Sequence, residues 1–244
     1  MRDVLILKAG DAANPIRLRA GDYERWFQLA LPPGLARLHV VHAHRNQRLP
    51  DVSSYDAVLM TGSPQSVTQP AEWMRRAADF MREAGERRKP VLGVCFGHQL
   101  LAFAYGTRVV RNPLGREVGT IEVDLTAEGS SDRLFAGLPK RLTVQATHQD
   151  IAERLPTAAT LLATNTNTSV QAFGVGDYVR AVQFHPEAPV TAMLALIDSR
   201  AALLEEEWTA RGGARGERVR SLLAGLCPTP HGLTLLRNFL ERFG

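Results

Sequence analysis

The first hundred residues alternate short apolar runs with longer helical patterns. Four apolar runs stand out in this region: Val4–Leu7, Leu38–Val41, Ala57–Met60 and Val91–Val94. Helical patterns lie between them, and from Trp73 to Ala84 the apolar side chains recur at i, i+3/i+4 spacing. Continuous apolar strands separated by helices are typical of a parallel sheet covered on both faces. The sequence therefore predicts an α/β fold with a mostly parallel central sheet.

The middle of the chain has a different pattern, with strand-like segments and few helices between them. These segments are residues 107–111, 118–125, 141–147, 159–164, 169–174 and 178–184. They indicate mixed or antiparallel edge strands added to the parallel core. The chain becomes helical again from Val190 onward. We expect a single domain over residues 1–244, in which residues 190–230 form a helical insertion before a terminal helix.

Composition excludes several classes of protein. Among 244 residues, 29 Lys and Arg face 25 Asp and Glu, and no run of like charges suggests a nucleic-acid-binding arm. Two cysteines are too few for a disulfide framework and fit a reducing compartment. No segment approaches the ~18 apolar residues of a membrane helix. We therefore expect a cytoplasmic protein that binds neither nucleic acid nor membranes.

A glycine-flanked cysteine, Cys95, follows the fourth apolar run directly. Gly93 and Gly97 allow the tight strand-to-helix turn of a nucleophile elbow, which lifts one side chain clear of the sheet. The dipole of the following helix favours the thiolate form, and the N–H of Phe96 points toward an attacked carbonyl as an oxyanion donor. A lone cysteine in this setting is more often a small buried hydrophobe. The prediction of a nucleophile therefore depends on a base.

His185 is the strongest candidate for that base among the seven histidines. It ends the apolar run Val179–Phe184 and is followed by Pro186 and Glu187. Residues i and i+2 of extended backbone project to the same side, so Glu187 can orient the imidazole. His39, His42 and His44 alternate as metal ligands can, but no Cys or carboxylate pair accompanies them, which disfavours zinc.

Gly62 supplies the third element of the predicted site. It lies in the turn TGSP directly after the run Ala57–Met60, where its backbone N–H can serve as a second oxyanion donor. The carboxyl ends of parallel strands share one edge of a sheet. Cys95, His185 and Gly62 all follow predicted strands, so we expect the three to meet at that edge.

Together, the segments TGSP (61–64), GVCFGHQ (93–99) and QFHPE (183–187) resemble the motifs of class I (triad) glutamine amidotransferases. The resemblance covers roughly residues 1–190 and the terminal helix, and implies a flavodoxin-like architecture. It also implies a catalytic triad in which Cys95 forms a γ-glutamyl thioester, His185 moves the proton and Glu187 orients His185. The remaining implied roles are oxyanion donors at Gly62 and Phe96, and contacts to the substrate from Gln99 and from His148.

The segment THQD (147–150) matches a substrate-pocket loop that is Ser-His-x-Asp in the glutaminase domain of GMP synthase. Three features depart from the family. Thr61 and Gln149 stand where glycine is frequent, and about 40 residues (190–230) separate Glu187 from the terminal helix. The inserted residues fit a lid, a dimer surface or a partner-docking face equally well.

The chain carries no P-loop and no Ser-Gly-Gly-x-Asp pyrophosphatase loop, so no nucleotide-activating half is visible. Our first hypothesis is a stand-alone glutaminase that releases ammonia, with a separate synthase as acceptor. The alternative is a γ-glutamyl hydrolase acting on a γ-glutamyl amine or peptide. An inactive regulatory or binding module is the third hypothesis. None of these requires a cofactor or a metal, and a homodimer is left open.

Overall fold

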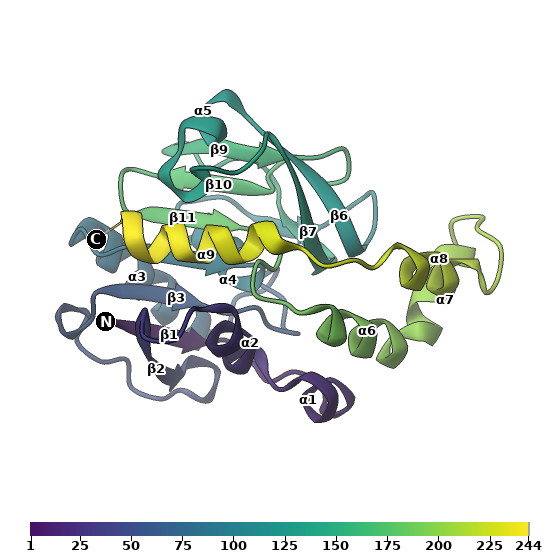
Figure 1. Cartoon of the computed structure of the whole chain (residues 1–244), viewed down its shortest axis with the longest axis horizontal. Coiled ribbons are helices and arrows are strands. Elements are labelled where there is room, and N and C mark those ends of the chain that lie inside the picture. Colours follow the sequence, from purple (N-terminus) through teal and green to yellow (C-terminus); the bar gives the residue numbers. More distant parts are fainter. Residues whose placement is uncertain (244) are drawn as a thin grey trace.

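The computed structural model describes residues 1–243 and contains a nine-stranded sheet with helices on both faces (Figure 1). Its strands are β1 Arg2–Lys8, β2 Ala36–His42, β3 Ala57–Met60, β4 Val91–Val94, β6 Glu117–Leu125, β7 Arg141–His148, β9 Ala159–Thr164, β10 Ala172–Val175 and β11 Val179–Val182. Strands β5 Val109–Arg111 and β8 Asp150–Ala152 pair separately. The helices are α1 Asn14–Ala20, α2 Tyr23–Ala30, α3 Glu72–Glu86, α4 Phe96–Ala104, α5 Ala127–Ser131, α6 Val190–Ser199, α7 Ala201–Thr209, α8 Glu217–Gly225 and α9 Pro230–Arg242.

The sheet has a parallel half and an antiparallel half. Its strand order is β2-β1-β3-β4-β11-β10-β9-β6-β7. The first five strands of this order run parallel to one another, and each later strand is antiparallel to its neighbour. The expected mostly parallel core with mixed edge strands is therefore confirmed, except that the segment predicted at 107–111 pairs as β5 with β8 outside this sheet. Strand β11 joins the parallel half although it lies far along the chain from β4.

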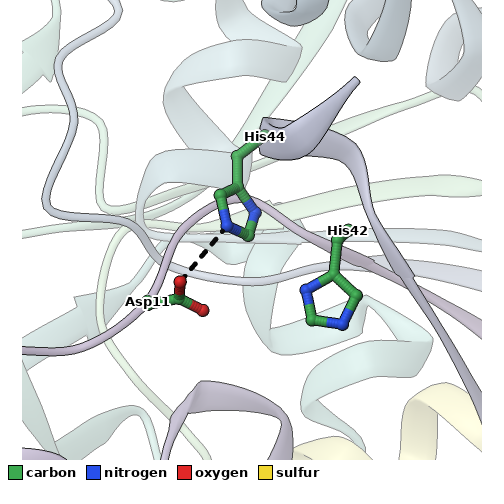
Figure 2. A group of neighbouring side chains, drawn as sticks. All are labelled: Asp11, His42 and His44. Carbon is green, nitrogen blue, oxygen red and sulfur yellow. Dashed lines mark ion pairs between the residues drawn. The ribbon is translucent and has the colours of Figure 1, made fainter. Parts of the chain in front are cut away.

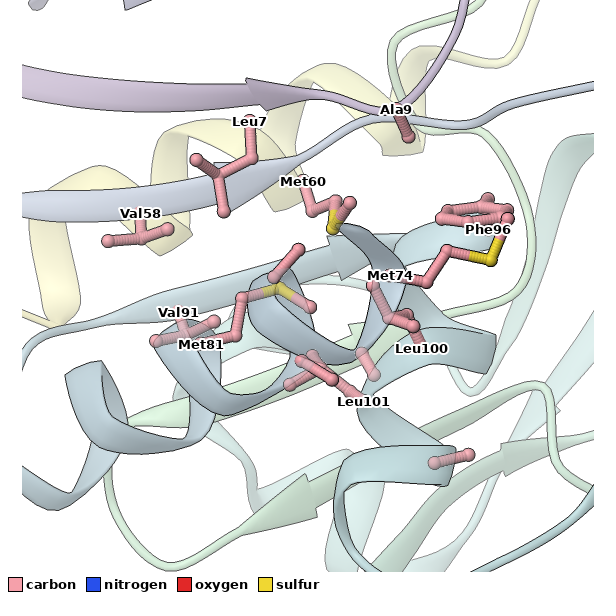
Figure 3. Close-up of a cluster of buried hydrophobic side chains, with 14 of the residues drawn as sticks. Leu7, Ala9, Val58, Met60, Met74, Met81, Val91, Phe96, Leu100 and Leu101 are labelled. Atoms are coloured by element: carbon pink, nitrogen blue, oxygen red, sulfur yellow. The ribbon is translucent and has the colours of Figure 1, made fainter. Parts of the chain in front are cut away.

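Alternate residues of the parallel strands build two separate cores. Leu5 and Leu7 of β1 face the side covered by α3 and α4, where Figure 3 shows Met60, Met81 and Leu101 packed together. The residues between them face α2 and the long helix α9, which crosses the sheet in Figure 1. Burial on both faces explains why these strands read as continuous apolar runs.

The helices between Glu187 and α9 pack with α1 and α2 in a third core. The buried side chains of α6 pack with Ile16 of α1 and Trp26 of α2. Leu204 of α7 and Leu222 of α8 complete this cluster. The cluster fixes α6, α7 and α8 beside the end of the sheet, as Figure 1 shows.

Three local features differ from the sequence prediction. Helix α1 was not predicted, because only Ile16 among its residues is buried and the apolar periodicity is too weak. Strand β10 begins at Ala172 rather than at 169, next to an irregularity in its pairing with β9. Strand β11 ends at Val182 rather than Phe184, and the N–H of His185 instead bonds the Gln145 carbonyl across an isolated bridge, at 2.8 Å. Among residues 1–243, no helix has the length and apolar character that crossing a membrane requires.

Candidate active site

Three neighbouring parallel strands carry the three sequence motifs. Strand β4 lies between β3 and β11, and all three run in the same direction. Gly62 follows β3, Cys95 follows β4 and His185 follows β11. The structure therefore brings the predicted residues to one edge of the sheet, although 90 residues separate Cys95 from His185 along the chain.

Cys95 occupies the turn between β4 and α4 in a conformation that non-glycine residues rarely adopt. Its φ is 52° and its ψ is −98°. A Cβ on Gly93 would lie 2.4 Å from the carbonyl oxygen of Gly97, and one on Gly97 would lie 2.8 Å from that of Met60. The Cys95 N–H bonds the Val182 carbonyl at 2.9 Å. Both glycines are thus required for a turn that holds a strained cysteine, a feature that clusters at active sites.

His185 and Glu187 form a buried pair behind the thiol. The imidazole Nδ1 lies 2.7 Å from the Glu187 Oε1, and the two residues are 2% and 3% exposed. Burial alone would lower the pKa of His185. The charges of Glu187 and Cys95, with the hydrogen bond to Glu187, outweigh burial and hold this pKa well above its usual 6.5. The arrangement suits an imidazole that takes a proton from the thiol and keeps it close.

Gly62 packs directly against the His185 ring. A Cβ on Gly62 would lie 2.7 Å from the imidazole Cε1. The Thr61 hydroxyl accepts a bond from the Ala9 N–H at 3.0 Å and donates one to the Gly62 carbonyl at 2.9 Å, which fixes the orientation of this peptide. Within residues 1–243, the N–H groups of Gly62 and Phe96 have no hydrogen-bond acceptor. Threonine at 61 therefore supports the turn, and both amides are free to bind an oxyanion.

A pocket of about 290 Å³ opens in front of Cys95 and is lined by Gln99, His148 and Asp150, among others. The Gln99 Nε2 donates to the Asp150 carbonyl at 2.7 Å, which holds the amide side chain in the wall. The His148 Nε2 lies 3.0 Å from the Glu117 Oε2. Burial would raise the pKa of Glu117, but hydrogen bonds from His148 and neighbouring amides outweigh it and hold this pKa below its usual value.

Three arginines, which the sequence prediction did not include, also line this pocket: Arg111, Arg116 and Arg200. The Arg116 guanidinium pairs with Glu207 of α7 at 3.0 Å and donates to the Gln149 Oε1 at 3.0 Å. Burial lowers the pKa of Arg200 below its usual value, and the charge of Arg116 adds to this effect. No local pattern distinguishes these three among 29 Lys and Arg residues, so only the fold identifies them.

Asp11, His42 and His44 lie close enough together to hold a metal ion (Figure 2). The Asp11 carboxylate, however, already lies 2.9 Å from the Lys8 Nζ and 2.7 Å from the Arg45 Nη2. Two cations at this distance neutralise the carboxylate and oppose a divalent ion. This donor set fits an ion-pair network better than a metal centre.

A family profile, individual protein sequences and a solved structure all show similarity to this chain. The sequence profile of the family "Glutamine amidotransferase class-I" matches residues 34–198, a region that contains the three predicted triad residues. The chain is 29% identical to gamma-glutamyl peptidase 3 of Arabidopsis thaliana over 199 residues, which cover 78% of this chain and 76% of that protein. It is 31% identical to the glutamine-hydrolyzing GMP synthase subunit of Saccharolobus solfataricus, over 64% of this chain and 79% of that protein. The crystal structure of a glutamine amidotransferase from Thermotoga maritima superposes with a TM-score of 0.76 at 24% identity, over 99% of this chain and 97% of the other.

Proposed function

This chain belongs to the class-I glutamine amidotransferase family, and we propose that it hydrolyses γ-glutamyl amide bonds through a thioester on Cys95. One observation carries the proposal: a strained cysteine lines a pocket, with a buried His–Glu pair behind it and two free backbone amides beside it. These are the nucleophile, the oriented base and the oxyanion donors that acyl transfer requires.

In the first half of the reaction, His185 accepts the thiol proton and the Cys95 sulfur attacks the γ-carbonyl carbon of the substrate. The negative oxygen of the tetrahedral intermediate is bound by the N–H groups of Gly62 and Phe96. The C–N bond then breaks, and the leaving amine takes the proton from the His185 imidazolium. Glu187 holds the imidazole at 2.7 Å throughout, so that the ring faces the sulfur in the correct tautomer.

In the second half, water attacks the thioester carbon and gives its proton to the neutral His185. The same two amides bind the second oxyanion. The C–S bond breaks, glutamate is released, and the thiolate and imidazolium are restored. No step requires a cofactor.

Two leaving groups fit this chemistry: the amine of an amino acid or peptide, and ammonia. We favour the first. A pocket with three arginines suits a γ-glutamyl peptide, and the likeness to a gamma-glutamyl peptidase supports that choice. Glutamine, with a separate synthase accepting its ammonia, is the second candidate, supported by the likeness to part of a GMP synthase. We also propose that the chain is a single domain, with helices α6 to α8 inserted between Glu187 and α9.

Purified protein offered glutamine, a γ-glutamyl dipeptide and a γ-glutamylamine tests the proposal, with glutamate release as the readout. We expect Cys95→Ala to abolish hydrolysis of every substrate. Cys227→Ala is the matched control, because Cys227 is the other free cysteine and is exposed, and it should retain full activity. Retained activity in Cys95→Ala, in a protein with unchanged circular dichroism, would overturn the thioester mechanism.

A further inference from the structure

The charges that line the pocket do not balance one another. Its charged side chains are three arginines and a single carboxylate, Asp150. Arg116 is already paired with Glu207 behind the pocket wall. Among residues 1–243, neither Arg111 nor Arg200 forms an ion pair with a carboxylate. Two guanidinium groups therefore face one carboxylate in the region that receives the substrate.

Of these two guanidinium groups, that of Arg200 is better placed to bind a carboxylate of the substrate. Its side chain is partly buried, and the hydrogen bond to the Thr147 hydroxyl at 3.1 Å uses one of its five N–H donors. It lines the same pocket as Cys95. Arg111 is instead exposed at the end of β5, where solvent screens its charge. A carboxylate on the substrate would thus gain most from Arg200.

The backbone of Arg200 is fixed where α6 meets α7. Its N–H bonds the Leu196 carbonyl at 3.1 Å, and its carbonyl accepts from the Leu204 N–H at 2.9 Å. Both leucines are buried in the third core with α1 and α2. The segment between Glu187 and α9, which contains none of the family motifs, therefore holds the Arg200 side chain at the pocket.

The charges of a γ-glutamyl group would balance only part of the positive charge of the pocket. That group carries one ammonium, which Asp150 can match, and one α-carboxylate, which one arginine can match. We propose that Arg200 binds a second carboxylate, on the leaving amino acid, and so selects γ-glutamyl peptides over glutamine. In such a peptide only the amide nitrogen and one carbon separate this carboxylate from the attacked carbonyl, which places it near Cys95. This inference rests on the proposed function.

The test compares γ-glutamylglycine with γ-glutamylglycinamide, which differ only in the charge of the leaving group. Wild-type protein should prefer the acid in kcat/KM by about 10- to 100-fold, the range of a charge-assisted hydrogen bond. In Arg200→Gln this ratio should fall toward one, mainly through KM for the acid. Arg200→Lys should recover part of the preference, since it restores the charge. Arg108→Gln is the matched control, because Arg108 is 78% exposed, pairs with Glu153 and lies outside the pocket.

Equal losses on both substrates in Arg200→Gln would overturn the inference, because Arg200 would then bind the α-carboxylate or act through the fold. Wild-type protein that hydrolyses both substrates without preference would overturn it as well, and would leave the thioester mechanism standing. If wild-type protein cleaves neither substrate and Cys95 is never acylated, the proposed function itself fails.

Discussion

Replacing Gly62 with alanine tests how closely the His185 imidazole, the proposed base, is confined. The added Cβ would lie 2.7 Å from the His185 Cε1, whereas ordinary contact begins at 3.4 Å, so the ring must move by about 0.7 Å. The ring is 2% exposed and bonded to Glu187, which leaves it no free direction. A displacement near 1 Å can cost about 10²-fold in rate. We therefore expect kcat to fall by about 10²-fold, with KM changed far less.

Alanine keeps the backbone N–H at position 62, so this loss would come from the displaced ring and not from a missing oxyanion donor. Steady-state hydrolysis measures kcat, and the alkylation rate of Cys95 by iodoacetamide reports the thiol–imidazole contact independently. Gly225→Ala is the matched control, because a Cβ there meets nothing within 4 Å. A kcat for Gly62→Ala equal to that of the wild type would refute the assignment of His185 as the confined base.

Burial lowers the pKa of His98 to about 3, and the charge of His148 adds to this, whereas unfolded histidine titrates near 6.5. Protons therefore bind this side chain first in the unfolded chain as pH falls, and His98 alone should lower the free energy of unfolding by about 2 kcal/mol between pH 7 and pH 5. His185, whose pKa is raised, contributes in the opposite direction over the same range, so the test is a difference between two proteins. In urea unfolding, His98→Gln should lose about 2 kcal/mol less stability than the wild type between these pH values, and an identical change in both proteins would contradict this origin. A Cβ on Gly232 of α9 would lie 2.2 Å from the Pro186 carbonyl, so Gly232→Ala should destabilise the protein by about 1–3 kcal/mol in the same assay; unchanged stability would contradict this contact. Because the Asp11 carboxylate is already paired with the side chains of Lys8 and Arg45, we expect no metal to bind there, and dialysis against a chelator should leave hydrolysis unchanged; a loss that zinc restores would contradict this expectation.

The parts of the fold that depend on local pattern could be predicted from the sequence. Strands β1, β3, β4 and β11 of the parallel half are buried on both faces, so their composition alone marks them. Glycines on both sides of Cys95 mark a tight turn, and the spacing of His185 and Glu187 marks a pair on one side of the chain. Strand ends of a parallel sheet share one edge, which is why motifs far apart in the sequence could be expected to meet.

The pocket wall could not be predicted, because it depends on contacts between distant segments. Arg116 directly precedes β6 and is held by Glu207, which is 91 residues later. Arg200 reaches the pocket only because α6 packs on α1, a helix whose sequence carries little apolar signal. The position of β11 in the sheet, between β4 and β10, likewise depends on pairing between segments far apart in the chain. The proposed substrate preference therefore rests on residues that only the tertiary structure identifies.

The most direct test of the central claim is the detection of the acyl-enzyme. Protein mixed rapidly with a γ-glutamyl substrate, quenched in acid and digested should yield the Cys95 peptide with one γ-glutamyl group, as measured by mass spectrometry. We expect this adduct on Cys95 and not on Cys227, and more of it at short reaction times than after the substrate is exhausted. Substrate turnover without any adduct on Cys95 would contradict the thioester mechanism.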